Sequence, residues 1–141
     1  SDGRTGLFMT ETDILRFADP NFNTIKESET VADAISLMSK IDQSELIVVN
    51  QSGEFVGKTN SLSLFNKQGP LSSVDVIDKD CVFIKHDASV QSAMEIASDF
   101  VGEIIPIVQT DQNKAVAIIT EGAIFQAYLS KQSQTVEMEK R

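Results

Sequence analysis

The stretch from Glu45 to Phe65 reads ELIVVNQSGEFVGKTNSLSLF and determines how the rest of the chain is interpreted. It contains an apolar run, a polar turn that ends in Gly53, a second apolar run and the start of an amphipathic segment. This pattern predicts a β-hairpin followed by a helix. The stretch holds no residue that marks a catalytic centre, so its meaning depends on whether the unit occurs again.

The same unit does occur again, between Glu103 and Phe125, as EIIPIVQTDQNKAVAIITEGAIF. Upstream of it, SVQSAM from Ser89 aligns with TVADAI from Thr30, 59 positions earlier. After the turn the offset becomes 60 positions, because the second turn contains one extra residue. Internal repetition of this kind predicts that the chain consists of two copies of one structural unit.

Each copy is predicted to have the element order β-α-β-β-α. Thr30 and Ser89 are predicted helix N-caps, and apolar residues follow them at helical spacing. The expected strands are 22–26, 46–49 and 55–59 in the first copy and 82–86, 104–108 and 115–119 in the second, and the expected closing helices are 61–66 and 121–130. Because one repeat cannot bury both its sheet and its helices, we expect an α+β fold of two β-α-β-β-α repeats packed with pseudo-two-fold symmetry.

The expected domain boundaries follow from the same alignment. Residues 1–68 form an N-terminal segment and the first repeat, and residues 69–130 form a linker and the second repeat. Gly69 and Pro70 mark the linker, because neither residue continues a helix well. Residues 131–141 are predicted to be a polar tail that frays, because they show no apolar face.

Charge and composition exclude several classes of partner. The net charge of −9, with 12 basic and 21 acidic residues, disfavours binding to nucleic acid or to an anionic membrane. The single cysteine, Cys81, excludes an internal disulfide and metal sites built on paired cysteines. No apolar run reaches the ~18 residues of a membrane span, so direct membrane insertion is not expected. Because the sequence begins at Ser1 and not at Met, we expect either a processed product or a fragment of a larger protein.

The chain resembles a tandem pair of CBS domains, also called a Bateman module. The resemblance is carried by the element order, by IPIV at 105–108 before a polar turn, and by AIIT at 117–120. It covers residues 13–130. It implies a non-catalytic regulatory module that requires no cofactor, commonly binds an adenine nucleotide such as ATP, ADP or AMP between its repeats, and forms a homodimer through the repeats.

The family pattern for nucleotide binding is only partly present. A Gly near the end of the last strand precedes a hydroxyl residue, and an Asp follows three positions later to hold the ribose. Here Asn60 and Ser63 stand at the hydroxyl and Asp positions of the first copy. The second copy has Thr120 and then Ala123, and Glu121 beside Thr120 would repel a phosphate. We therefore expect weak binding or none at the first site, with the Thr120 cleft the better of the two.

The apolar positions that would contact an adenine ring are better retained than the ribose carboxylates. They lie on the first and second strands of each copy. The full set of predicted nucleotide-binding residues is Thr24, Ile47, Asn60, Ser63, Ile84, Pro106, Thr120 and Glu121.

Other candidate chemistry is weaker. His86 and Asp87 could form a base with an orienting acid, but neighbours on a strand point to opposite faces, so an ordinary surface or capping histidine is preferred. Cys81 is interpreted as a small, partly buried apolar residue. Asp78, Asp80 and Asp87 are interpreted as solvated carboxylates and not as Mg²⁺ ligands. No catalytic residue and no metal site is predicted.

The sequence IFQAYL at 124–129 is similar to the end of the second repeat in the cytoplasmic tails of ClC-type chloride channels and transporters. This resemblance implies an attached membrane transport domain and a position at the cytoplasmic face of a membrane. Two alternatives are kept: a dimerisation or interaction module without a ligand, and the CBS pair of a magnesium or cobalt transport protein.

Overall fold

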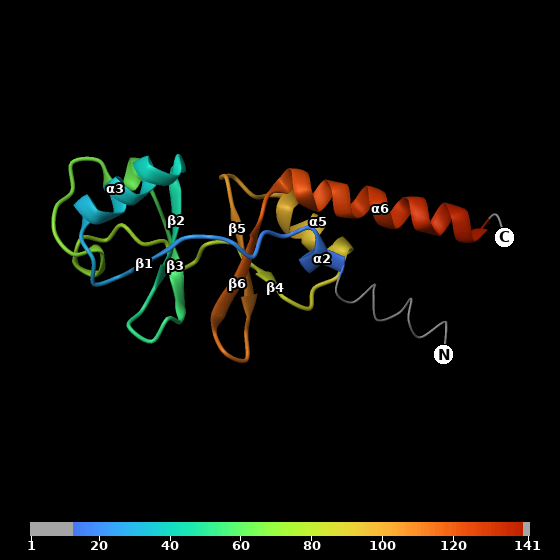
Figure 1. Ribbon diagram of the computed structural model, residues 1–141, viewed down its shortest axis with the longest axis horizontal. Helices are drawn as coiled ribbons and strands as arrows, with labels where there is room; N and C mark the ends of the chain where they lie inside the picture. The colour runs from blue at the N-terminus through green and yellow to red at the C-terminus, as the bar shows by residue number, and fades with distance from the viewer. Residues whose placement is uncertain (1–12, 140–141) are drawn as a thin grey trace.

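The two repeats follow each other along the long axis of the molecule (Figure 1). A computed structural model of the chain describes residues 13–139. The two β-sheets face each other near the middle, and the helices lie on the outer sides of the sheets (Figure 1). The junction between the sheets is therefore the place where side chains of both repeats meet.

The first repeat has the predicted β-α-β-β-α order. Its elements are β1 (Thr24–Lys26), α3 (Val31–Ile41), β2 (Glu45–Val49), β3 (Phe55–Asn60) and α4 (Ser61–Leu64). The sheet order is β1-β2-β3, with a parallel pair followed by an antiparallel pair. Thr30 is the N-cap of α3, as predicted: its hydroxyl accepts the Asp33 amide, and the Asp33 carboxylate accepts the Thr30 amide in return.

The second repeat has the same topology. Its elements are β4 (Ile84–Lys85), α5 (Val90–Ser98), β5 (Ile105–Gln109), β6 (Lys114–Ile119) and α6 (Glu121–Glu139), in the sheet order β4-β5-β6. The predicted cap Ser89 is confirmed, because its hydroxyl accepts the Ser92 amide. Together the two repeats confirm the predicted α+β fold.

The segment that precedes each repeat in the sequence packs against the other repeat. Helix α2 (Asp13–Arg16) packs against α5 and α6, and Ile14 is wholly buried in the core of the second repeat. The short 3-10 helix η1 (Leu71–Ser73) follows the Gly69-Pro70 linker, and Leu71 is buried in the core of the first repeat. The predicted sequence boundary between residues 68 and 69 thus does not coincide with the division between the two cores.

Two element boundaries differ from the predicted ones. The first strands are shorter than expected, because Phe22 and Val82 leave their sheets and lie at the junction. The closing helix of the second repeat is longer than the predicted range 121–130, because α6 continues through the expected polar tail to Glu139. Residues 123–139 contain no Gly or Pro and many good helix formers, so local propensity sustains the helix without an apolar face.

Backbone register confirms the pseudo-two-fold relation. Leu46 pairs with Thr59 in the first sheet as Ile105 pairs with Ile119 in the second. The segment before each sheet pairs with the last strand of the other sheet in an equivalent way. Asp78, before β4, forms a backbone bridge with Lys58 on β3, and Asp19, before β1, forms one with Ile118 on β6. Lys58 therefore corresponds to Ile118, Glu45 to Ile104, and Asp78 to Asp19.

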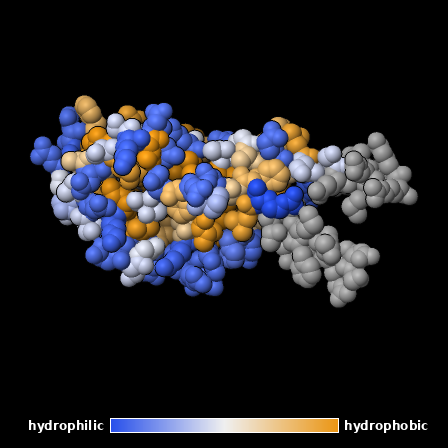
Figure 2. Space-filling view, in the orientation of Figure 1, coloured by the Kyte–Doolittle hydropathy of each residue, from blue (hydrophilic) through white to orange (hydrophobic). Residues whose placement is uncertain are grey.

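An apolar cluster joins the two repeats. Phe22 and Phe55 pack against this cluster. Its buried side chains come from both sheets and are Ile47, Val49, Ile104 and Ile118. The Phe55 amide also donates a hydrogen bond of 2.8 Å to the Asn113 carbonyl. Apolar side chains reach the surface around the middle of the molecule among mostly hydrophilic neighbours (Figure 2).

Helix α6 has 19 residues, which is close to the length of a membrane-spanning helix, but its sequence is polar. Within residues 13–139, no helix combines the length and the apolar character that crossing a membrane requires.

Candidate ligand-binding cavity between the repeats

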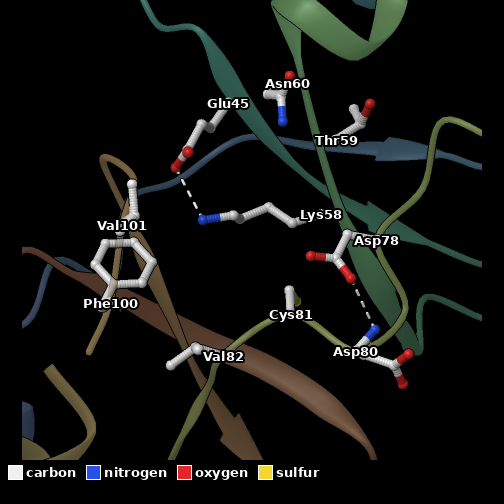
Figure 3. A pocket seen from close by; sticks show the side chains of 10 residues that line it. All are labelled: Glu45, Lys58, Thr59, Asn60, Asp78, Asp80, Cys81, Val82, Phe100 and Val101. Atoms are coloured by element: carbon white, nitrogen blue, oxygen red, sulfur yellow. Dashed lines mark hydrogen bonds and ion pairs between the residues drawn. The ribbon is translucent and has the colours of Figure 1, made fainter.

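A cavity of about 180 Å³ lies at the junction of the repeats (Figure 3). Its walls come from β2 and β3, from the segment before β4, and from the loop after α5. The lining residues are Glu45, Lys58, Thr59, Asn60, Asp78, Asp80, Cys81, Val82, Phe100 and Val101. Both repeats contribute to the walls, so a molecule bound here would contact both.

A buried ion pair forms one side of the cavity. Lys58 Nζ lies 2.9 Å from Glu45 Oε1, and each side chain is only 10% exposed. The Lys58 ammonium also donates a hydrogen bond of 2.8 Å to the Ile104 carbonyl and lies 4.8 Å from the centroid of the Phe100 ring. Lys58 belongs to the first repeat, whereas Ile104 and Phe100 belong to the second, so this ammonium group links the repeats.

Glu45 forms the other half of this link. Its Oε1 atom accepts the backbone N–H groups of Glu103 and Ile104, each at 3.0 Å. Gly102 lets the loop pass close to the pair: its φ of +149° is unfavourable for other residues, and a Cβ there would lie 2.7 Å from Glu45 Oε2 and 2.8 Å from the Phe100 ring. The loop after α5 is therefore fitted to the ion pair.

Sequence reasoning missed the ion pair, although the repeat alignment contains a signal for it. Glu45 and Lys58 stand at strand positions where the second repeat has Ile104 and Ile118. A charged residue at a position that is aliphatic in its twin indicates a buried partner. Comparison of the two copies at strand positions could thus have found both residues.

The equivalent cleft beside Thr120 is filled differently. Ile104 and Ile118 occupy the places of Glu45 and Lys58, and Phe22 occupies the place of Cys81. Ile104 and Ile118 belong to the apolar cluster that joins the repeats, and Phe22 packs against this cluster. A bulky aromatic residue therefore stands at the sequence position where the first cleft has a small thiol.

The hydroxyl and amide residues of the predicted site cap helices. Asn60 lines the cavity, and its side-chain oxygen accepts the Ser63 amide at 2.9 Å at the start of α4. The Thr120 hydroxyl accepts the Ala123 amide at 3.1 Å at the start of α6. Ser63 is exposed, and Glu121 is exposed beside a separate groove between α5 and α6.

The predicted ring-contact residues are mostly in the core. Ile47 and Ile84 are 0% exposed, the first in the cluster that joins the repeats and the second in the core of the second repeat. Pro106 is buried on β5, and Thr24 is exposed on β1. Among the eight predicted residues, Asn60 is the one that lines the junction cavity.

The residues weighed as a catalytic base or as metal ligands lie in different places. His86 is half-buried, and its backbone amide donates to the Val108 carbonyl, while no hydrogen-bond partner is seen for its Nδ1 atom among the described residues. Asp78 and Asp80 lie at the cavity, and Asp87 is exposed on the segment after β4. Within the described part of the chain, no three His, Cys, Asp or Glu side chains are arranged to hold a metal ion.

Cys81 is a small buried residue, as predicted, and is 9% exposed. Burial raises the pKa of its thiol from the usual 9.0 to about 11, and the positive charge of Lys58 offsets only part of this rise. Near neutral pH the thiol is therefore protonated and unreactive, although it lies in the cavity wall.

The rate of Cys81 alkylation tests this environment. At pH 8 we expect iodoacetamide to label the folded chain about 100-fold more slowly than the urea-unfolded chain, because the thiolate fraction falls about tenfold per pKa unit. The rate should rise about tenfold per pH unit up to a pH near 11. Since the folded thiol holds its proton more tightly, the stability of the folded state should fall as pH rises from 9 through 11. Equal labelling rates at pH 8 would contradict the buried position.

The geometry defines a class of protein: a module of two β-α-β-β-α repeats that share a cavity at their junction. The chain belongs to the CBS domain family, whose model matches residues 13–57 and 73–130. This family consists of regulatory domains that are not catalytic. The match confirms the resemblance to a tandem CBS pair. No curated protein matches the chain.

Solved CBS-pair structures share the fold. CBSX2 from Arabidopsis thaliana in complex with AMP is 20% identical, with a TM-score of 0.69 over 84% of this chain and 97% of that chain. The CBS domain pair of the protein MJ0100, in complex with 5′-methylthioadenosine and S-adenosylmethionine, is 18% identical, with a TM-score of 0.67 over 82% and 98%.

A third structure is the cytosolic domain of the Mg²⁺ channel MgtE in complex with ATP. It is 15% identical, with a TM-score of 0.67, and the match covers 77% of this chain and 46% of that chain. At these identities the likeness establishes the shared fold alone.

Proposed function

We propose that this CBS pair is a regulatory module that binds a small adenine-containing ligand in the junction cavity beside Asn60. The observation that carries the proposal is a cavity whose walls come from both repeats and include the ion pair that links them. A ligand there would favour one arrangement of the repeats by its differential affinity, and so bias whatever domain is attached.

The chemistry of the walls supports an adenine compound. Val82, Phe100 and Val101 offer apolar surface for a flat ring, and Asn60 and Asp78 offer polar groups at the other side. The structures of other CBS pairs with AMP, with ATP, and with 5′-methylthioadenosine and S-adenosylmethionine support the same ligand class.

The Thr120 cleft, with Thr24, Pro106 and Glu121, stays a second place for the ligand. A ring in this cleft would meet a bulkier and more apolar surface, because Phe22 packs against the cluster that contains Ile104 and Ile118. We therefore rank the Asn60 cavity first, in contrast to the order expected from the sequence.

Thermal unfolding with adenosine, AMP, ADP, ATP and S-adenosylmethionine tests the proposal. A compound that binds the folded chain at 100 times its dissociation constant should stabilise it by about 2.7 kcal/mol and raise the melting temperature. Occupation of the cavity should also slow the alkylation of Cys81 further, and Cys81 is the single cysteine of the chain. Absence of a shift with all five compounds at millimolar concentration would reject the proposal.

Asn60→Ala and Thr120→Ala form a matched pair of variants for the same measurement. Each removes one helix N-cap, so each should cost a similar ~1 kcal/mol of stability. Only Asn60→Ala should reduce the ligand-induced shift if the ligand occupies the cavity beside Asn60. The opposite result would place the ligand in the Thr120 cleft.

The second candidate function is an interaction module without a ligand. It is favoured by the Glu45–Lys58 pair, which already links the repeats. The homodimer also stays a proposal, supported by apolar side chains that are exposed on the helices or directly after them: Ile35, Leu62, Phe65, Phe125 and Leu129.

The identity of the attached domain is likewise a proposal. The chloride-transport attachment and the cytoplasmic face rest on the similarity of residues 124–129 alone. The magnesium-transport alternative rests on a shared fold with MgtE.

A further inference from the structure

The charged groups at the junction cavity are unfavourable for a phosphate. Its lining includes three carboxylates, from Glu45, Asp78 and Asp80, and one ammonium group, from Lys58. The Lys58 ammonium is already bound to Glu45 and to the Ile104 carbonyl and lies against the Phe100 ring. Because Lys58 compensates the charge of Glu45, an entering phosphate would face the uncompensated carboxylate of Asp78, in a chain whose net charge is −9.

The Asp78 carboxylate is held in a fixed position at this wall. The backbones of Asp78 and Lys58 form two hydrogen bonds: the Lys58 amide donates to the Asp78 carbonyl at 3.1 Å, and the Asp78 amide donates to the Lys58 carbonyl at 2.8 Å. Gly57 permits this approach, because a Cβ at position 57 would overlap the Asp78 carbonyl. Asp78 Oδ1 accepts the Asp80 amide at 3.0 Å. The second Asp78 oxygen points toward the centre of the cavity, whereas the Asp80 carboxylate turns away from it (Figure 3).

A carboxylate oxygen in this position can accept hydrogen bonds from ribose hydroxyl groups. The sequence places Ser63 where the family pattern has the ribose-binding Asp, and Ser63 does not line the cavity. Asp78 supplies an acceptor at the same cavity from a different segment, the chain before β4. The apolar wall at Val82, Phe100 and Val101 remains available for a ring.

We infer that the junction cavity selects an uncharged adenine nucleoside over the corresponding nucleoside phosphates, with Asp78 as the acceptor for the ribose hydroxyl groups. This inference rests on the proposed function, because it specifies the ligand of the same cavity. Adenosine and AMP are the decisive pair of probes, since they differ only in the phosphate group.

The second repeat provides a matched control for Asp78. Asp19 is its pseudo-symmetric equivalent: its backbone pairs with Ile118, and its Oδ1 accepts the Asn21 amide at 2.8 Å. Asp19→Asn and Asp78→Asn therefore remove the same charge from the same kind of turn. Of these two substitutions, only Asp78→Asn changes a residue that lines the junction cavity.

Isothermal titration of the full chain with adenosine and with AMP tests the inference. We expect adenosine to bind at least about tenfold more tightly than AMP. Asp78→Asn should weaken adenosine binding about 10- to 100-fold, because a hydrogen bond to a charged acceptor is lost, whereas Asp19→Asn should leave it unchanged. Raising the salt from about 0.01 to about 1 M shortens the Debye length from about 30 to about 3 Å, and should strengthen AMP binding while leaving adenosine binding constant.

The outcomes separate the two claims. If AMP binds as tightly as adenosine, the inferred selectivity is wrong, and if Asp78→Asn binds adenosine like the unchanged chain, the inferred role of Asp78 is wrong; in both cases the proposed function stands. If none of the adenine compounds binds, both the proposed function and the inferred ligand are wrong.

Discussion

Replacing Lys58 by methionine is expected to lower the free energy of unfolding by about 3–5 kcal/mol, because the change leaves the buried Glu45 carboxylate without its charged partner. Methionine matches the length of the lysine stem and can still pack against Phe100, so little of this loss comes from packing. A domain of this size is stable by about 5–15 kcal/mol, so the loss is a large share of the total. Urea unfolding at pH 7 measures it.

The double change Glu45→Gln with Lys58→Met is the control. The glutamine oxygen can still accept the Glu103 and Ile104 amides, and no unpaired charge remains. We therefore expect the double variant to be more stable than Lys58→Met alone, since neutral replacement of a buried ion pair is often tolerated. If Lys58→Met unfolds within about 0.5 kcal/mol of the unchanged chain, the pair behaves as a solvated surface pair and does not hold the repeats together.

Much of the fold was predictable because it is encoded locally and twice. The caps Thr30 and Ser89 and the hairpin signals occur in register in both copies, so each copy supports the reading of the other. The length of α6 was not predicted, because residues beyond Lys131 are held helical by propensity and show no apolar stripe. The short β1 and β4 were not predicted either, because Phe22 and Val82 lie at the junction of the repeats, a tertiary contact that the local pattern does not show.

The position of the cavity could not be predicted from the motif residues. Asn60 and Thr120 were correctly located at strand-to-helix transitions, where both cap a helix. The surroundings of each cleft depend instead on residues outside the motif: the small Cys81 lines the cavity beside Asn60, whereas its counterpart in the other repeat is the larger Phe22, which packs against the apolar cluster. Side-chain volume at the junction is a tertiary property, and a short family pattern does not record it.

Ile47→Ala is expected to lower the free energy of unfolding by about 2–5 kcal/mol and to weaken adenosine binding. Ile47 is 0% exposed in the cluster that joins the repeats, so its truncation leaves a void between the two sheets at the junction where the cavity lies. The junction should loosen, and the positions of groups from the two repeats should become less defined. Urea unfolding and titration with adenosine measure the two effects.

Ile84→Ala is the matched control, because Ile84 is equally buried but lies in the core of the second repeat alone. It should cost a similar ~2–5 kcal/mol of stability while adenosine binding to the folded chain stays close to normal. If Ile47 and Ile84 both contacted the ring directly, as the sequence pattern predicts, both variants would weaken binding to the same degree. The comparison thus separates a residue that supports the cavity through packing from one that contacts the ligand, at two positions where stability alone cannot distinguish these roles.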